Sequence, residues 1–182
     1  IGLLYDKYLE HGGEVIFNNK IEDFKNKDIT FKDKSFDAEL ILGCDGINSS
    51  IRTKKFVSVP PLFSGFTAWR SIKELSSPFE KNNGEDINFY LGPNSHIVTY
   101  PIGENTYSAT CIIKSSDWIE ESWVLEGTKD HFQSDFKDWN TELLTYLADS
   151  KLYKWGIFQR SPLESFSTNN IFLLGDSAHA MV

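Results

Sequence analysis

Hydrophobic spacing predicts a helix and several strands in the first part of the chain. The apolar residues of 1–11 recur at the interval of one helix face, and the glycine pair at 12–13 ends that helix. Residues 14–18 predict a strand, and residues 21–36 predict two short strands joined by a polar turn at 26–28.

Two further runs, at 40–42 and 171–174, are apolar without alternation. Such a run is typical of a strand buried on both faces of a sheet. Each run leads into a glycine turn and the start of a helix, and Asn48 or Ser49 can cap the first of these helices. Because α/β sheets bind ligands at the carboxyl ends of their strands, both turns are candidate binding elements.

The middle of the chain has a different texture. Polar, Gly or Pro stretches separate strand-like runs at 63–74, 86–92, 95–103 and 106–114. This pattern predicts an antiparallel sheet of about four strands. Short helices are expected in 125–139 and 141–150, and a further strand in 153–160.

The organisation is nested. A buried strand with a glycine turn lies near each end, and an antiparallel sheet with helices is inserted between them. The predicted fold class is α/β, α+β overall, with a partial Rossmann-like domain formed by 1–57 and 161–182 and an inserted domain at 58–160.

Composition and charge exclude several classes of function. The chain has 26 acidic and 18 basic residues and a formal net charge of −8, which argues against a nucleic-acid partner. No apolar run reaches the roughly 20 residues that a membrane helix needs. Cys44 and Cys111 lie far apart without metal-ligand spacing, and no signal peptide is visible, so we expect reduced thiols, a cytoplasmic location and no metal site.

Each glycine turn carries an aspartate, Asp45 or Asp176. A carboxylate there can accept hydrogen bonds from sugar hydroxyls, and glycine lets the backbone approach a ligand closely. The helix start that follows offers unpaired N–H groups to an anion or an electron-rich ring edge. The alternative is that each aspartate is only a turn or cap residue.

These two turns resemble the flavin motifs of FAD-dependent aromatic hydroxylases. The segment GCDGINSSIR resembles the Asp-Gly motif of that family, and GDSAHAMV resembles its second flavin motif. The matching residues are Gly43, Asp45, Gly46, Ser49 and Arg52 in the first and Gly175, Asp176, Ala178 and His179 in the second. The motifs occur in the family's order, about 130 residues apart, and the strands between them are similar to those of salicylate-hydroxylase-like members.

The resemblance implies an FAD- and NAD(P)H-dependent monooxygenase with the p-hydroxybenzoate hydroxylase fold. Such an enzyme uses O₂ and a C4a-hydroperoxyflavin to hydroxylate a small aromatic substrate, and 58–160 becomes the substrate domain. By the same resemblance, Asp176 holds the ribityl hydroxyls, and the following helix start faces the flavin ring. Asp45 and Arg52 order the turn near the pyrophosphate.

Three residues are candidates for the substrate side. Arg70 can line the flavin's substrate side and pair with a carboxylate or phenolate, or it can be a surface arginine. His96 and Tyr100 share one face of a predicted strand and can line the substrate cavity or belong to the core. We interpret His179 as a structural member of the flavin turn rather than a general base.

The family's N-terminal Gly-rich dinucleotide motif does not occur in these residues. The sequence therefore reads as an internal fragment, and we expect these residues alone to bind FAD weakly or not at all. Other functions remain open: an epoxidase, a halogenase or a polyprenyl or lipid reductase of the same superfamily, or a truncated, non-catalytic binding module.

Overall fold

The computed structural model describes residues 1–25, 28–31, 34–57, 59–74, 86–103, 106–116, 118 and 125–181. These residues form two compact units. Unit 1 comprises Ile1–Val59 and Pro162–Ala178, and unit 2 comprises Pro60–Ser161 and His179–Val182.

Unit 1 contains two three-stranded sheets and three helices. One sheet is an antiparallel meander of β1 (Ile21–Lys25), β2 (Asp28–Phe31) and β3 (Lys34–Asp37). The other has the order β11 (Ser167–Thr168), β12 (Ile171–Leu173) and β4 (Ile41–Gly43), in which β12 and β4 run parallel. The helices are α1 (Gly2–Glu10), α2 (Ser50–Lys55) and α6 (Asp176–His179), the last of which ends in unit 2.

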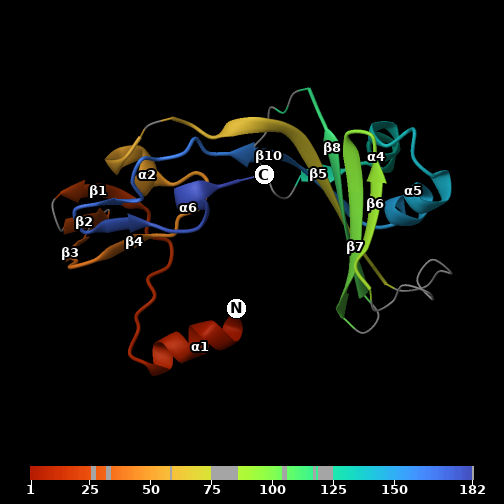
Figure 1. The fold of residues 1–182 in the computed structure, drawn as a ribbon. Helices are drawn as coiled ribbons and strands as arrows, with labels where there is room; N and C mark the ends of the chain where they lie inside the picture. The colour runs from red at the N-terminus through yellow and green to blue at the C-terminus, as the bar shows by residue number, and fades with distance from the viewer. Residues whose placement is uncertain are drawn as a thin grey trace. The chain divides into compact units, whose positions relative to one another are not determined.

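Unit 2 is built on one antiparallel sheet of six strands. Their order is β6 (Asn88–Gly92), β7 (Ser95–Gly103), β8 (Thr106–Lys114), β5 (Leu62–Glu74), β10 (Leu152–Gln159) and β9 (Leu125–Gly127). The helices α4 (Lys129–Asp135) and α5 (Thr141–Ala148) lie along one face of this sheet (Figure 1). Phe132 of α4 and Leu147 of α5 join Trp69 of β5 in the core on that face.

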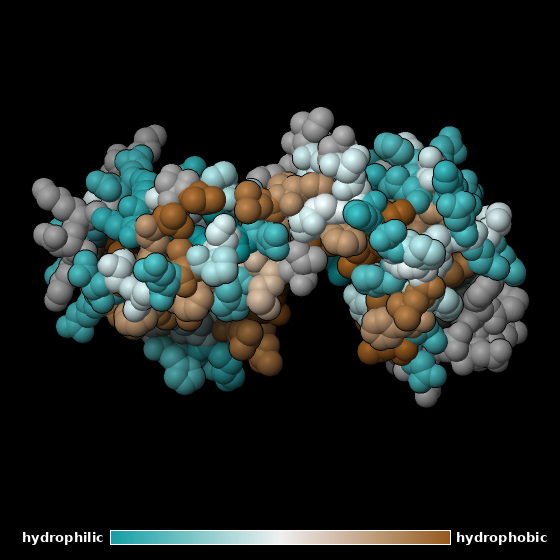
Figure 2. Space-filling view, turned by 45° about the horizontal axis from the view of Figure 1, so that its top comes forward, coloured by the Kyte–Doolittle hydropathy of each residue, from teal (hydrophilic) through white to brown (hydrophobic). Residues whose placement is uncertain are grey.

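The sheet therefore has two different faces. Its helix-covered face carries fully buried residues such as Trp69 and Ile97. Among the residues that the structure describes, no helix covers the other face, which we call the open face. Apolar side chains reach the molecular surface in several places (Figure 2), and on the open face Phe89 and Leu91 of β6 are 67% and 82% exposed.

Several sequence predictions are confirmed. The first helix, the four-strand antiparallel pattern, the two short helices and the strand near 153–160 all occur. The predicted mixture of helix and sheet is the observed fold class. The sheet is larger than expected, because β9 and β10 extend it to six strands.

The predicted strand at 14–18 is wrong, since this segment pairs with no strand of the described chain and instead contains a turn at 17–18. A strand needs a neighbour for its backbone hydrogen bonds, which residue preferences alone do not supply. The region 21–36 forms three strands rather than two. Residues 26 and 27 of its predicted turn lie outside the described residues.

The two apolar runs are not buried on both faces. In β4 and β12 Ile41 and Leu173 are buried, whereas Leu42 is 53% exposed and Phe172 40% exposed. Alternate residues of a strand point to opposite faces. Only one face of this sheet packs against the core of unit 1, so an uninterrupted apolar run does not reveal which of its faces is covered.

The predicted segment boundaries lie at 57/58 and 160/161, and the boundaries between the compact units lie at 59/60 and 161/162. One difference concerns the end of the chain. Residues 179–182 group with unit 2 rather than with the two glycine-turn segments, and the Arg160 N–H donates to the Ala180 carbonyl. The roles assigned to the segments, cofactor binding and substrate binding, remain predictions.

Candidate functional site

The parallel pair of strands brings the two glycine turns together. In β4 and β12, Gly43 lies opposite Leu173, and the Leu174 N–H donates to the Gly43 carbonyl over 2.9 Å. Parallel strands end at the same edge of a sheet, so turns about 130 residues apart in sequence become neighbours. A Cβ at Gly43 would lie 2.9 Å from the Leu173 Cδ2, so a larger residue here would require the Leu173 side chain to move.

The carboxylate of Asp45 is hydrogen-bonded to residues at the start of α2. It accepts hydrogen bonds from the Ser49 Oγ at 2.6 Å, the Ser50 N–H at 2.8 Å and the Ile51 N–H at 3.2 Å. Backbone N–H groups in a first helical turn have no acceptor within the helix, so this carboxylate supplies one. Ser49 is the N-cap, and its Oγ accepts from the Arg52 N–H at 2.9 Å. Asp45 therefore orders the turn, as a cap residue does.

Arg52 joins the two motifs. Its side chain is 1% exposed, and Nη1 donates to the carbonyls of Ser177 at 3.1 Å and Ala178 at 2.6 Å. These carbonyls belong to the four-residue helix α6, whose length leaves its final C=O groups without N–H donors inside the helix. A buried cation is costly without such bonds, so the guanidinium and the end of α6 satisfy each other.

Ser177 is a second connection, which sequence reasoning missed. Its fully buried Oγ lies 2.5 Å from the Gly43 carbonyl oxygen and 2.7 Å from that of Leu174. The only signal in the sequence is the small-residue position between Asp176 and Ala178 in the second motif. Serine there combines small size with a hydroxyl donor.

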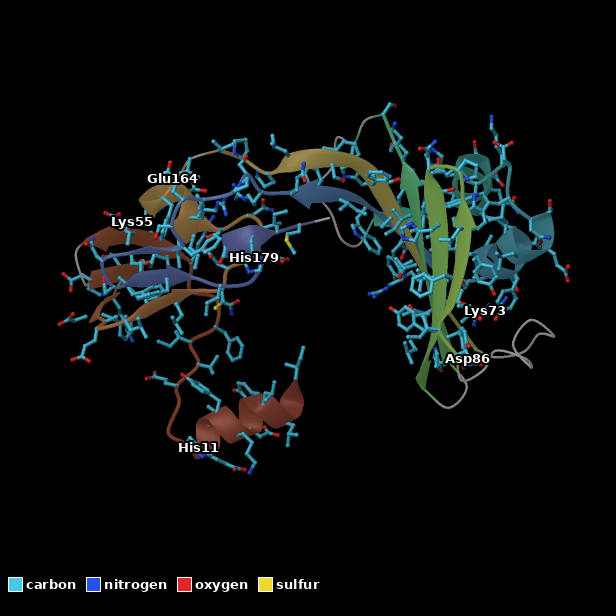
Figure 3. The ribbon with its side chains drawn as sticks, viewed as in Figure 1. His11, Lys55, Lys73, Asp86, Glu164 and His179 are labelled. Carbon is cyan, nitrogen blue, oxygen red and sulfur yellow. The ribbon has the colours of Figure 1, made fainter. Side chains whose placement is uncertain are left out.

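Asp176 differs from Asp45 in its surroundings. It is exposed at the start of α6, directly after Gly175, whose φ of +59° lies in the left-handed region that favours glycine. Within the part of the chain that the structure describes, its carboxylate has no hydrogen-bond partner. Figure 3 shows His179 at the other end of α6, where it is also exposed. Asp176 is thus the carboxylate of this edge that is available to a ligand.

Arg70 and Tyr100 come together on the open face of unit 2. Arg70 pairs with Thr110 of β8, and Tyr100 pairs with Ser108 of the same strand, so the four side chains share one face. The Ser108 hydroxyl has the largest effect on the pKa of Tyr100, which it lowers, and Arg70 and Thr110 lower it further. Burial acts in the opposite direction and is outweighed.

His96 lies on the same face but outside this group. It is half-buried and pairs with Ile112 of β8, four residues before Tyr100 on β7. Among the described residues, no hydrogen bond or ion pair joins it to Arg70 or Tyr100. The sequence did not single out Ser108 and Thr110, because their proximity to Tyr100 depends on strand register.

The structure contains, in its described ranges, no group of three or more His, Cys, Asp or Glu side chains that could hold a metal ion. None of the helices described there is long and apolar enough to cross a membrane.

Comparison with known proteins identifies the relationship. The profile of a family described as FAD binding domain matches residues 3–182. The chain is 33% identical over 153 residues to 3-amino-4-hydroxybenzoate 2-monooxygenase PtmB3 of Streptomyces platensis, covering 81% of this chain and 38% of that protein. It is 29% identical over 142 residues to 3-hydroxybenzoate 6-hydroxylase of Polaromonas naphthalenivorans (strain CJ2), covering 76% and 35%. The chain thus spans less than half the length of these relatives.

Solved structures share the fold. A salicylate hydroxylase substrate complex superposes with a TM-score of 0.82 at 21% identity, covering all of this chain and 51% of that one. CtdE in complex with FAD gives a TM-score of 0.80 at 17% identity and covers 100% of this chain and 53% of that one. At these identities the likeness establishes the fold alone.

Proposed function

Because the chain belongs to the FAD binding domain family, we propose that the protein is an FAD- and NAD(P)H-dependent monooxygenase that hydroxylates a small aromatic substrate with O₂. The relatives named as hydroxybenzoate monooxygenases support the reaction and the aromatic substrate. When bound, FAD supplies the redox chemistry, in which NAD(P)H provides the electrons and O₂ the oxygen atom. The residues of this chain would bind and orient FAD and the substrate and shield them from water.

The available carboxylate of Asp176 is the observation that carries the cofactor assignment. The Asp45 carboxylate accepts hydrogen bonds from four donor groups at the start of α2, whereas Asp176 is exposed at the same sheet edge without a partner in the described residues. A carboxylate accepts hydrogen bonds from hydroxyl groups, and the ribityl chain of FAD is a row of hydroxyls. Asp176 would hold that chain, and Gly175 would allow its close approach.

The residues that connect the turns would keep this edge in shape for the cofactor. Arg52 and Ser49 hold α2 and α6 in place through their hydrogen bonds. Gly43 and Gly46 would allow the backbone to approach the pyrophosphate, with Gly46 already at φ +73°. Ala178 and His179 complete the second motif as parts of the turn.

The substrate would lie against the open face of unit 2. Arg70 is an exposed cation on this face, and a guanidinium binds a carboxylate or phenolate with paired hydrogen bonds. Tyr100 would contact a polar substituent of the ring, and His96 would lie beside the substrate on the same face. This arrangement suits an aromatic acid that carries a hydroxyl or amino group.

Flavin binding tests the cofactor assignment in the protein that carries this chain. We expect Asp176→Asn to weaken FAD binding by about ten- to a hundred-fold, the size of hydrogen bonds to a charged group. Asp149→Asn, which changes an exposed carboxylate of unit 2, is the matched control and should leave binding unchanged. Equal FAD affinity in Asp176→Asn and the unchanged protein would contradict the assignment.

Turnover tests the substrate assignment. NAD(P)H oxidation should rise when small phenolic acids are added, and ¹⁸O₂ should label the hydroxylated product. Arg70→Ala should raise KM for an aromatic carboxylate at least ten-fold, with a smaller change in Arg70→Lys and none for a neutral phenol. A requirement for chloride, or turnover of a lipid instead of phenolic acids, would contradict aromatic hydroxylation.

A further inference from the structure

Two hydroxyl groups on the open face lie between the candidate substrate residues. Ser108 and Thr110 occupy alternate positions of β8, the strand that separates β5 from β7. The register places Ser108 beside Tyr100 on β7 and Thr110 beside Arg70 on β5. Directly paired residues in antiparallel strands have their Cβ atoms about 5 Å apart, so each hydroxyl adjoins its partner's side chain.

The burial of Ser108 needs an explanation. The residue is 2% exposed, and its Oγ makes no well-aligned hydrogen bond with any described residue. A buried hydroxyl without a partner is unfavourable, so serine is a poor choice here for packing alone. The group it approaches is the phenol of Tyr100, whose pKa it lowers. Ser108 therefore faces Tyr100 across the strand pair, without a hydrogen bond between them in this conformation.

We propose that Ser108 and Thr110 are positioning residues that hold the Tyr100 phenol oxygen as a hydrogen-bond acceptor toward a hydroxyl on the substrate ring. The proposal rests on the proposed function, since it assigns the orientation of the substrate at that same face. Ser108 donates its O–H to the phenol oxygen, and Thr110 supports the same oxygen from the next position on β8. Arg70 then faces the acidic group of the substrate while Tyr100 faces its hydroxyl.

This arrangement specifies a class of substrate. Arg70 offers only donors, so it selects an acceptor such as a carboxylate. Tyr100, with its oxygen supported by two hydroxyls and a cation, selects a donor. A hydroxylated aromatic acid carries both groups on one ring, whereas an apolar lipid carries neither.

Tyrosine titration provides a test that does not depend on turnover. In ¹³Cζ-tyrosine NMR spectra recorded across pH, the signal missing from Tyr100→Phe belongs to Tyr100. We expect Ser108→Ala to raise the titration midpoint of Tyr100, because a donor to the ionised phenol is lost. The isosteric Thr110→Val should raise the Tyr100 midpoint by a smaller amount, and Thr110→Ser, which keeps the hydroxyl, should leave the midpoint at its original value.

A matched control separates this effect from general disturbance of the sheet. Ser71 is a 1% exposed serine of β5 whose hydroxyl bonds to Ser150 and to the Leu147 carbonyl on the helix-covered face. Ser71→Ala should leave the Tyr100 midpoint unchanged. The other charged or titratable side chains of the open face, which could contribute to the midpoint, are Glu74 of β5, His96 of β7, Lys114 of β8, Glu126 of β9 and Tyr153 of β10.

Kinetics of the flavin-loaded protein give the second readout. Ser108→Ala should lower kcat for a hydroxylated aromatic acid about ten-fold while KM changes by less than about two-fold, and it should move the alkaline side of the pH profile upward. An unchanged Tyr100 midpoint in both Ser108→Ala and Thr110→Val would overturn the proposal. An equal shift in Ser71→Ala would do the same.

The outcomes distinguish this proposal from the proposed function. If no phenolic acid is turned over but the Tyr100 midpoint moves as described, the positioning role stands and the reaction is wrong. If turnover occurs but the midpoint does not move, the reaction stands and the positioning role is wrong. Should Ser108→Ala fail to fold, the Thr110→Val and Thr110→Ser pair decides.

Discussion

The two units hold their candidate residues in different ways. In unit 1, hydrogen bonds from Arg52 and Ser177 tie together two short motifs, and the buried apolar cluster around them is small. In unit 2, a large core of side chains such as Trp69 and Phe132 supports a sheet, and register alone brings Arg70 beside Tyr100. Unit 1 is thus held together by hydrogen bonds between distant segments, and we call Arg52, Ser177 and the carbonyls that they contact the clasp. Unit 2 is a sheet supported by a large apolar core, and we call this sheet the platform.

The difference explains which candidate residues a sequence can reveal. A clasp needs particular residues at fixed positions within a short segment, and these positions form a motif. A platform needs only apolar residues on one face, and its other face is free to vary. The predictions that follow separate the two units, from the largest expected effect to the smallest.

The largest expected difference between the two units is in the reactivity of their thiols. Cys44 in unit 1 is exposed, whereas Cys111 in unit 2 is 1% exposed. Burial raises the pKa of the Cys111 thiol, so in the folded state it stays protonated even at alkaline pH. We expect a thiol reagent to modify Cys44 at once and Cys111 at least about a thousand-fold more slowly, because unfolding must come first. Rapid modification of two thiols in the native protein would contradict the packed core.

Removal of a core ring should be the most damaging substitution in unit 2. Phe132 is fully buried, with its ring centroid 5.4 Å from that of Trp69 and 5.1 Å from that of Phe136. Phe132→Ala should lower the free energy of unfolding by about 3–5 kcal/mol. All five tryptophans lie within 60–161, so tryptophan fluorescence during urea unfolding reports on unit 2.

Breaking the clasp should affect unit 1 alone. Arg52→Met keeps much of the side-chain volume but leaves the carbonyls of Ser177 and Ala178 without their donor. We expect a loss of about 3 kcal/mol, seen by far-ultraviolet circular dichroism and not by tryptophan fluorescence, with Arg52→Lys intermediate. If the fluorescence transition moves equally, the two units unfold together and the comparison between them fails.

Helix caps give the smallest and best-matched contrast. Ser49 caps α2 in unit 1, and Asn140 caps α5 in unit 2 by accepting from the Leu143 N–H at 3.0 Å. Ser49→Ala and Asn140→Ala should each cost about 1 kcal/mol in urea unfolding. Ser49→Ala should cost more, because this buried hydroxyl also donates to Asp45. Equal losses would show that the cap, and not the additional bond to Asp45, decides the contribution of Ser49 to stability.

Much of the fold could be predicted from local pattern. The helices of unit 2 and the strands of its sheet follow from spacing, and Ser49 at the start of α2 follows from its residue type. The error at 14–18 arose because strand preference does not provide a pairing partner. The exposed Leu42 and Phe172 show the same limit, since an apolar run does not reveal which of its faces is covered.

The residues of the candidate site likewise divide into those that a local sequence pattern reveals and those that depend on tertiary structure. The positions of Asp45 and Arg52 were found because a motif concentrates them in ten residues. The roles of Ser108 and Thr110 depend on how β8 pairs with strands on both sides, which no local pattern records. The different surroundings of Asp45 and Asp176 likewise became visible only with the hydrogen bonds in place.

The bond between Arg52 and Ser177 joins residues that are 125 positions apart, and it has a consequence for the order of folding. Closing so long a loop is entropically costly unless the chain between the ends is already compact. Nearly all of unit 2 lies in that interval, in the continuous segment 60–161, and can fold during synthesis before β12 has been made. We therefore expect the sheet edge that carries the two glycine turns to be the last part of these units to close, so that any delay in unit 2 also delays the assembly of unit 1.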